Sequence, residues 1–175
     1  MRARLLLLLA AVGLLVGCGN DSAPPPKVAR ESAGVQVRRV ATQWGDTVSE
    51  EGFLEGDPNG VSEFHVVTRR TFILKDDNRV DVHIERDEVY TTKLGPFRCK
   101  AKGDLRGVVR YAWAGDEAEV ALTLGPGELP RTCDRPGFAV TSKSLGETKL
   151  TLYLRSDQLI AKTSARDRTV LLPLQ

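Results

Sequence analysis

Beyond its first thirty residues the chain alternates apolar and polar positions with a period of two, which predicts β-strands. The clearest alternation flanks Gly115-Asp116, and its apolar positions are Val109, Tyr111, Trp113, Ala118, Val120 and Leu122. A two-residue loop puts all of these side chains on one face, and Gly115 supplies the positive φ that the turn requires. We therefore predict an antiparallel hairpin centred on this dipeptide.

A second hairpin is predicted around Asp76-Asp77-Asn78. A three-residue loop pairs Leu74 with Val80, Phe72 with Val82 and Arg70 with Ile84, which keeps the apolar side chains together. A two-residue loop would mix the two faces, and Asn78 tolerates the left-handed conformation that the longer loop needs. Arg70 therefore falls on the inner face of the predicted sheet.

The C-terminal part predicts a meander of three strands with loops at Ser156-Asp157 and Arg166-Asp167. Its apolar pairs are Leu154 with Leu159, Leu152 with Ala161, Ala161 with Leu172, and Leu159 with Leu174. Pro173 cannot donate to a β-ladder, so the last strand is expected to lie at an edge or to end there.

Three other segments complete the predicted fold. Residues 35–44 are predicted as the first strand, a turn at Gly95-Pro96 separates two strands, and residues 125–137 form a proline-rich loop. These elements predict an all-β domain, an antiparallel meander of roughly eight to ten strands that closes into a small barrel or packs as a sandwich.

The N-terminus resembles the signal peptide of a bacterial lipoprotein. Arg2 and Arg4 precede an uncharged apolar run, residues 5–16, which is too short to cross a bilayer as a helix. The run ends in Leu15-Val16-Gly17-Cys18, which is similar to the lipobox of exported lipoproteins. The resemblance implies cleavage before Cys18, acyl chains on that residue and an anchor in the cell envelope. Gly19, where an Asp would retain such a protein at the inner membrane, points to the outer membrane, with the domain facing the periplasm.

The chain thus divides into a signal peptide (1–17), a lipidated cysteine with a proline-rich tether (18–34) and a β-domain (35–175). The tether contains Pro24-Pro25-Pro26 and almost no large apolar residues. Loss of the signal peptide removes two arginines and lowers the formal net charge from +2 to zero. A balanced charge gives no support for nucleic-acid binding.

Cys99 and Cys133 remain once Cys18 is acylated, and an even pair in an exported protein predicts a disulfide. On the chain-entropy model this bond stabilises the fold by roughly 3–4 kcal/mol. A metal site from these cysteines with His65 and His83 would lack any close ligand spacing, so neither a metal nor another cofactor is expected.

No catalytic motif stands out in the sequence, since it contains no Gly-x-Ser-x-Gly, His-Glu-x-x-His, phosphate loop or dinucleotide fingerprint. Both histidines are expected on outward faces of strands. The acidic pairs Glu50-Glu51 and Asp87-Glu88 are also expected at the surface, because adjacent strand residues point to opposite faces and form no carboxylate dyad. We expect a protein that is not an enzyme.

Residues 107–124 (GVVRYAWAGDEAEVALTL) and the leucine-rich strands after them look like the late meander of small lipocalin-like barrels. The resemblance implies a barrel with a ligand cavity. Arg70 on the inner face would be costly unless paired, and in such a cavity it would meet the carboxylate or phosphate of an amphiphile; alternatively it reaches solvent where the strand bulges. Tyr111 and Trp113 belong either to the core or to the same cavity.

Two functions follow from these expectations. The first is an anchored envelope lipoprotein whose non-catalytic β-domain binds another envelope protein or a cell-wall component. The second is a lipocalin-like carrier of a small amphiphile. An open apolar cavity near Arg70 would favour the carrier, whereas a filled barrel would favour the first function.

Overall fold

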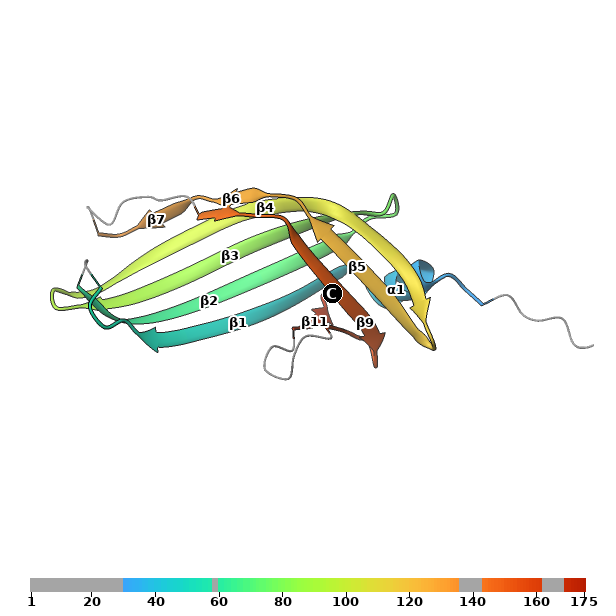
Figure 1. Ribbon diagram of the computed structural model, residues 1–175, viewed down its shortest axis with the longest axis horizontal. Helices are drawn as coiled ribbons and strands as arrows, with labels where there is room; N and C mark the ends of the chain where they lie inside the picture. Colours follow the sequence, from blue (N-terminus) through green and yellow to red (C-terminus); the bar gives the residue numbers. More distant parts are fainter. Residues whose placement is uncertain (1–29, 58–59, 136–142, 162–168) are drawn as a thin grey trace, which may run out of the picture. The chain divides into compact units, whose positions relative to one another are not determined.

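The computed structural model describes residues 30–57, 60–135, 143–161 and 169–175, and its folded unit begins at Glu31. Eight antiparallel strands close into a barrel in the order β3-β2-β1-β11-β10-β9-β5-β4, with β4 pairing back onto β3 (Figure 1). They are β1 (Gln43–Phe53), β2 (Val61–Leu74), β3 (Arg79–Thr92), β4 (Gly95–Ala114), β5 (Glu117–Leu124), β9 (Thr148–Arg155), β10 (Gln158–Ala161) and β11 (Val170–Pro173). The predicted all-β antiparallel fold is confirmed, and of the two predicted alternatives, barrel and sandwich, the structure has the barrel.

Three short strands add to the barrel. β7 (Arg131–Cys133) pairs with β4, while β6 (Gly127–Leu129) and β8 (Lys143–Leu145) pair with each other in a separate two-stranded sheet. The prediction of an irregular loop over residues 125–137 was therefore wrong for β6 and β7. The frequent prolines and glycines of this stretch indicate turns, and strands of only three residues between them are too short to show an alternating pattern.

The first element is a helix, α1 (Ala33–Val40), so the strand predicted over residues 35–44 is wrong except at Gln43 and Trp44, which begin β1. Ser32 caps α1 by accepting a hydrogen bond from the Val35 N–H, and Ala33 and Val37 are buried one turn apart. The predicted tether therefore extends too far, because Ala33 and Gly34 already belong to α1. No helix in the described part of the chain is long and apolar enough to span a membrane.

The two hairpin registers predicted from the inner-face pattern are confirmed. β2 and β3 pair Leu74 with Val80, Phe72 with Val82 and Arg70 with Ile84, and Asn78 has φ 59°. β4 and β5 pair Trp113 with Ala118, Tyr111 with Val120 and Val109 with Leu122, and Gly115 has φ 64°. In both hairpins a short turn and one buried face determine the same register.

The C-terminal meander was predicted only in part. β9 and β10 pair Leu154 with Leu159 and Leu152 with Ala161, as predicted, but β11 sets Leu171 rather than Leu174 opposite Leu159. Leu171 is fully buried and Leu172 is 50% exposed. The predicted loop at Arg166-Asp167 lies outside the described residues. The β3–β4 turn also lies two residues before its predicted place, because Thr92 already pairs with Gly95.

The main core includes the closed part of the barrel, where α1 packs against β4 and β5, and a second, small cluster of Val61, Phe97 and Cys99 lies outside the closed ring. The largest fully buried side chains of the main core are Trp44, Phe72, Leu122, Leu152, Leu159 and Leu171. β11 pairs with β1 only at Trp44 and Gly45, and β5 pairs with β4 only from Gly107 onward. β1–β4 therefore continue past the closed ring as a four-stranded sheet (Figure 1).

Candidate ligand-binding cavity

An apolar cavity of about 190 Å³ lies on the inner face of β2, β3 and β4, where the closed ring passes into the four-stranded sheet. The side chains that line its wall from these strands and from β5 and β9 include Phe72, Val82, Ile84, Leu105, Leu124 and Leu150. Leu129 of β6 and Leu145 of β8 line it as well. The two-stranded sheet is therefore part of the wall.

Glycine at position 103 lets β6 lie across β4. A Cβ on Gly103 would collide with the carbonyl oxygen of Glu128 and with the Leu129 side chain. The backbones approach closely only because this residue, on the inner row of β4 opposite Ile84, has no side chain. The glycine thereby brings Leu129 over the cavity.

Arg70 lies on the inner face as predicted and lines the cavity. Its Nε donates to Asp46 Oδ1 at 2.9 Å and one of its terminal nitrogens donates to Oδ2, from the residue directly opposite on β1. The Asp46 side chain is only 5% exposed, whereas that of Arg70 is 24% exposed. Since a guanidinium has five N–H donors and Asp46 accepts two of them, three N–H groups of Arg70 are not used by Asp46.

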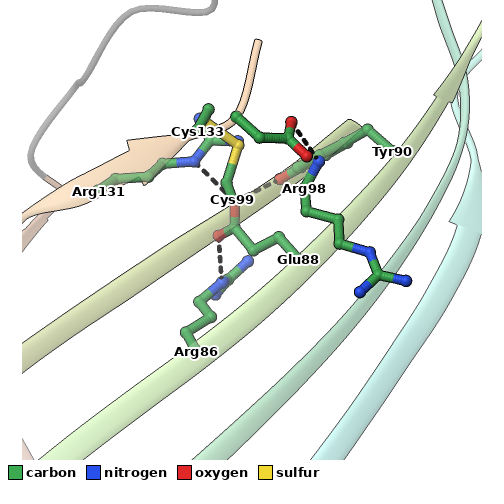
Figure 2. The surroundings of a disulfide bond; sticks show 8 residues. Arg86, Glu88, Tyr90, Arg98, Cys99, Arg131 and Cys133 are labelled. Carbon is green, nitrogen blue, oxygen red and sulfur yellow. Dashed lines mark hydrogen bonds and ion pairs between the residues drawn. A yellow bond between two sulfur atoms is a disulfide. The ribbon is translucent and has the colours of Figure 1, made fainter. Parts of the chain in front are cut away.

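Arg86 is a second guanidinium on the cavity wall, and it belongs to an ion cluster beside the disulfide (Figure 2). Its Nε donates to Glu88 Oε1 at 2.7 Å, while Arg131 Nε lies 2.7 Å from Glu88 Oε2. The Tyr90 hydroxyl donates to the same carboxylate at 2.9 Å. Burial and this bond to Glu88 raise the pKa of Tyr90. The prediction that Glu88 is a surface residue was wrong, because it occupies the buried row of β3.

The predicted disulfide between Cys99 and Cys133 is present and joins directly opposed residues of β4 and β7, with their Cα atoms 4.0 Å apart. Figure 2 shows it next to Glu88 and Arg131. Arg131 therefore reaches the ion cluster from a three-residue strand that a covalent bond holds against β4. The disulfide and the ion pair of Arg131 with Glu88 together hold β7, the strand that follows β6, against the barrel.

Tyr111 and Trp113 lie on the inner row of β4, as predicted, but they pack against α1 and not against the cavity. Trp113 Nε1 donates to the Glu31 carbonyl at 3.1 Å, and a Cβ on Gly34 would collide with the Tyr111 ring. The Arg38 guanidinium lies 5.4 Å from the centre of that ring. Burial raises the pKa of Tyr111, and Arg38 opposes this shift. These aromatic residues position the helix and belong to the core, the first of the two predicted alternatives, and they do not line this cavity.

The other sequence candidates lie apart from the cavity. His65 and His83 are half exposed on the outer face, with Nδ1 of His65 3.8 Å from Glu51 and His83 paired with Asp104. Within the described ranges no group of three His, Cys, Asp or Glu residues is placed to hold a metal ion. Cys18 lies outside those ranges.

Sequence reasoning missed Arg86 as a residue of the cavity wall and Asp46 as the ion-pair partner of Arg70. The signal for Arg86 was present, because it follows Ile84 by two positions and therefore shares its face. Asp46 gave no such signal, since its place opposite Arg70 depends on a long-range pairing that starts at Trp44. Comparisons with protein-family models, with curated proteins and with solved structures found no match for this chain.

Proposed function

We propose that this protein is a lipid-anchored component of the bacterial cell envelope whose barrel binds a small amphiphile with an anionic head group. The observation that carries the proposal is the apolar cavity lined by both Arg70 and Arg86. These residues are diagonal neighbours on adjacent strands, which places their Cα atoms about 7–8 Å apart. Two guanidiniums at that spacing suit a carboxylate or a phosphate.

The size of the cavity limits the ligand. An engineered cavity of about 150 Å³ in another protein stays dry and admits benzene, so about 190 Å³ accommodates a single ring or a short acyl chain. The apolar walls favour the tail, and the ion-paired set of Arg70, Arg86 and Arg131 with Asp46 and Glu88 carries one more positive than negative charge. The proposed role is binding and transport, with no catalytic step.

The binding site can be tested with octanoate and with octyltrimethylammonium as a cationic probe of similar chain length. The double variant Asp46→Asn, Arg70→Gln removes both charges together and so avoids an unpaired buried carboxylate. We expect it to weaken octanoate binding about 10–100-fold, the loss typical of one charge-assisted hydrogen bond of about 1.5–3 kcal/mol. Isothermal titration calorimetry measures the change.

The matched control is Arg69→Gln, Asp87→Asn, which removes an ion pair of 2.7 Å on the outer face of the same strand. Octanoate should bind to this variant as it binds to the wild type. Leu150→Phe, which fills the cavity without changing its charge, should weaken binding as well. Equal affinity for the two probes, or equal losses in the Arg70 and Arg69 double variants, would contradict the proposal.

The proposed anchor depends on Cys18. Mass spectrometry of the protein from bacterial envelopes should find a diacylglycerol and an N-acyl chain on this residue, and Cys18→Ser should move the protein from the membrane to the soluble fraction, because several acyl chains together supply the anchoring. The outer membrane is the proposed location. Unchanged membrane partitioning of Cys18→Ser would contradict the anchor without affecting the test of the cavity.

Binding of a partner protein is the second candidate function. It is favoured by one observation that is independent of the cavity: no strand in the described part of the chain pairs with residues 46–53 on one side of β1.

A further inference from the structure

One edge of the four-stranded sheet is open. β1 pairs with β2 along its whole length, but on its other side β11 reaches only Trp44 and Gly45. Among the strands that the structure describes, none pairs with residues 46–53 on that side. In Figure 1 β1 forms the border of the sheet over this stretch. An open edge of this length is a template for strand addition.

The alternation of the backbone identifies the groups at this edge. The Gln43 carbonyl accepts from the Leu174 N–H of the β11 side, whereas the Thr42 carbonyl accepts from the Leu74 N–H of the β2 side. In an antiparallel strand the N–H and C=O of one residue point to the same side, and successive residues alternate. The open side therefore presents the backbone N–H and C=O groups of Thr47, Ser49, Glu51 and Phe53.

The open edge is acidic. β1 contains Asp46, Glu50 and Glu51 and no lysine, arginine or proline, although lysine and proline are the residues that commonly protect edges. Asp46 is bound by Arg70, whereas Glu50 makes no ion pair within the described residues. Two copies paired in antiparallel through the whole stretch would bring their Glu50 and Glu51 residues next to each other. That repulsion disfavours a second copy and favours a cationic strand.

Side chains at the edge define the partner further. Glu50 is opposite the buried Val66 and so belongs to the inner row, whereas Glu51 is opposite His65 on the outer row. Phe53 follows Glu51 on the outer row and is 79% exposed. We propose that the edge of β1 binds an extended segment of a partner protein by strand addition. The segment carries two successive basic residues, which lie opposite Glu50 and Glu51. An apolar residue that lies opposite Phe53 is two positions away from the basic residue opposite Glu51.

The test uses a fluorescent probe peptide of the sequence Thr-Thr-Phe-Thr-Lys-Lys-Val-Thr-Val-Thr and a control peptide with Glu-Glu in place of Lys-Lys. In an antiparallel pairing the phenylalanine of the probe lies opposite Phe53 and the lysines lie opposite Glu51 and Glu50. Fluorescence anisotropy should show that the Lys-Lys peptide binds at least tenfold more tightly than the Glu-Glu peptide. The double variant Glu50→Lys, Glu51→Lys should reverse this preference.

A backbone variant distinguishes strand addition from a charge effect alone. Ser49→Pro removes an N–H at the open side without removing a ladder bond to β2, whereas Ser49→Ala keeps that N–H. We expect Ser49→Pro to weaken binding of the Lys-Lys peptide at least tenfold and Ser49→Ala to leave its affinity unchanged. Circular dichroism checks that both variants fold. Octanoate binding should stay unchanged in both, which separates this test from that of the cavity.

Three results would overturn the proposal. Equal affinity for the two peptides excludes a cationic partner strand. If Ser49→Pro and Ser49→Ala bind the Lys-Lys peptide with equal affinity, backbone hydrogen bonding between the peptide and the open side of β1 is excluded. A wild-type dimer in sedimentation that Ser49→Pro converts into a monomer identifies a second copy, and not a foreign segment, as the occupant.

Discussion

Trp44→Ala is expected to lower the free energy of unfolding by about 3–5 kcal/mol, the range for removing a large aromatic side chain from a core. Trp44 is fully buried at the start of β1, opposite Phe72. Its Nε1 donates to the Ala41 carbonyl at 2.9 Å, at the C-cap of α1. The alanine variant therefore loses both the packing of the barrel and the contact that holds α1. Urea denaturation followed by fluorescence of the remaining tryptophan measures the change.

Trp44→Phe separates the two contributions. It keeps most of the ring in the core but leaves the Ala41 carbonyl without its donor, so a loss of about 1–3 kcal/mol is expected. Equal stability of the wild type and the alanine variant would contradict the placement of this residue in the core.

Replacing both cysteines, Cys99→Ala together with Cys133→Ala, is expected to cost about 3–4 kcal/mol on the chain-entropy model. The bond spans a sequence separation of 34 residues, so its loss enlarges the unfolded ensemble considerably. In the folded state β7 would then depend on its three pairings with β4 and on the ion pair of Arg131 with Glu88. Chemical denaturation of the oxidised wild type and the variant gives the difference.

Thr132→Ala is the matched control, because this exposed residue of β7 lies between Arg131 and Cys133 but takes no part in the disulfide. Its stability should stay within about 0.5 kcal/mol of the wild type. A double-cysteine variant as stable as this control would show that the disulfide contributes nothing to the fold.

Local patterns in the sequence predicted the hairpins well. The β2–β3 and β4–β5 turns are short, and only one register places Phe72, Val82, Tyr111 and Val120 on the same face. A shift of one residue would expose that whole face, which is why the pattern alone was sufficient. The antiparallel barrel follows from a series of such hairpins.

The same patterns did not predict the strand register across a longer connection or the type of the first element. Eight residues separate β10 from β11, and a connection of that length does not fix a register from the sequence, so the predicted pairing of Leu159 with Leu174 was wrong. At the N-terminus Val35 and Val37 alternate like strand residues. In the helix, however, Val37 is buried, whereas Val35 is 42% exposed, because Ser32 starts a turn whose inner face repeats every three to four residues.

Of the ligand-binding residues predicted from the sequence, only Arg70 lines the cavity. The β2–β3 register placed Arg70 on the inner face, but its partner Asp46 depends on the β1–β2 pairing, which the mistaken first strand concealed. The same error left Tyr111 and Trp113 as ligand candidates. Their actual neighbour, α1, was absent from the predicted fold, so nothing in the pattern assigned them to packing.

The most direct test of the proposed function is a crystal structure of the β-domain grown with octanoate. We expect an acyl chain between Phe72 and Leu150 and a carboxylate within hydrogen-bond distance of the Arg70 or Arg86 guanidinium. An acyl chain bound only on the outer face, or a cavity filled by its own side chains at saturating octanoate, would contradict the proposed function.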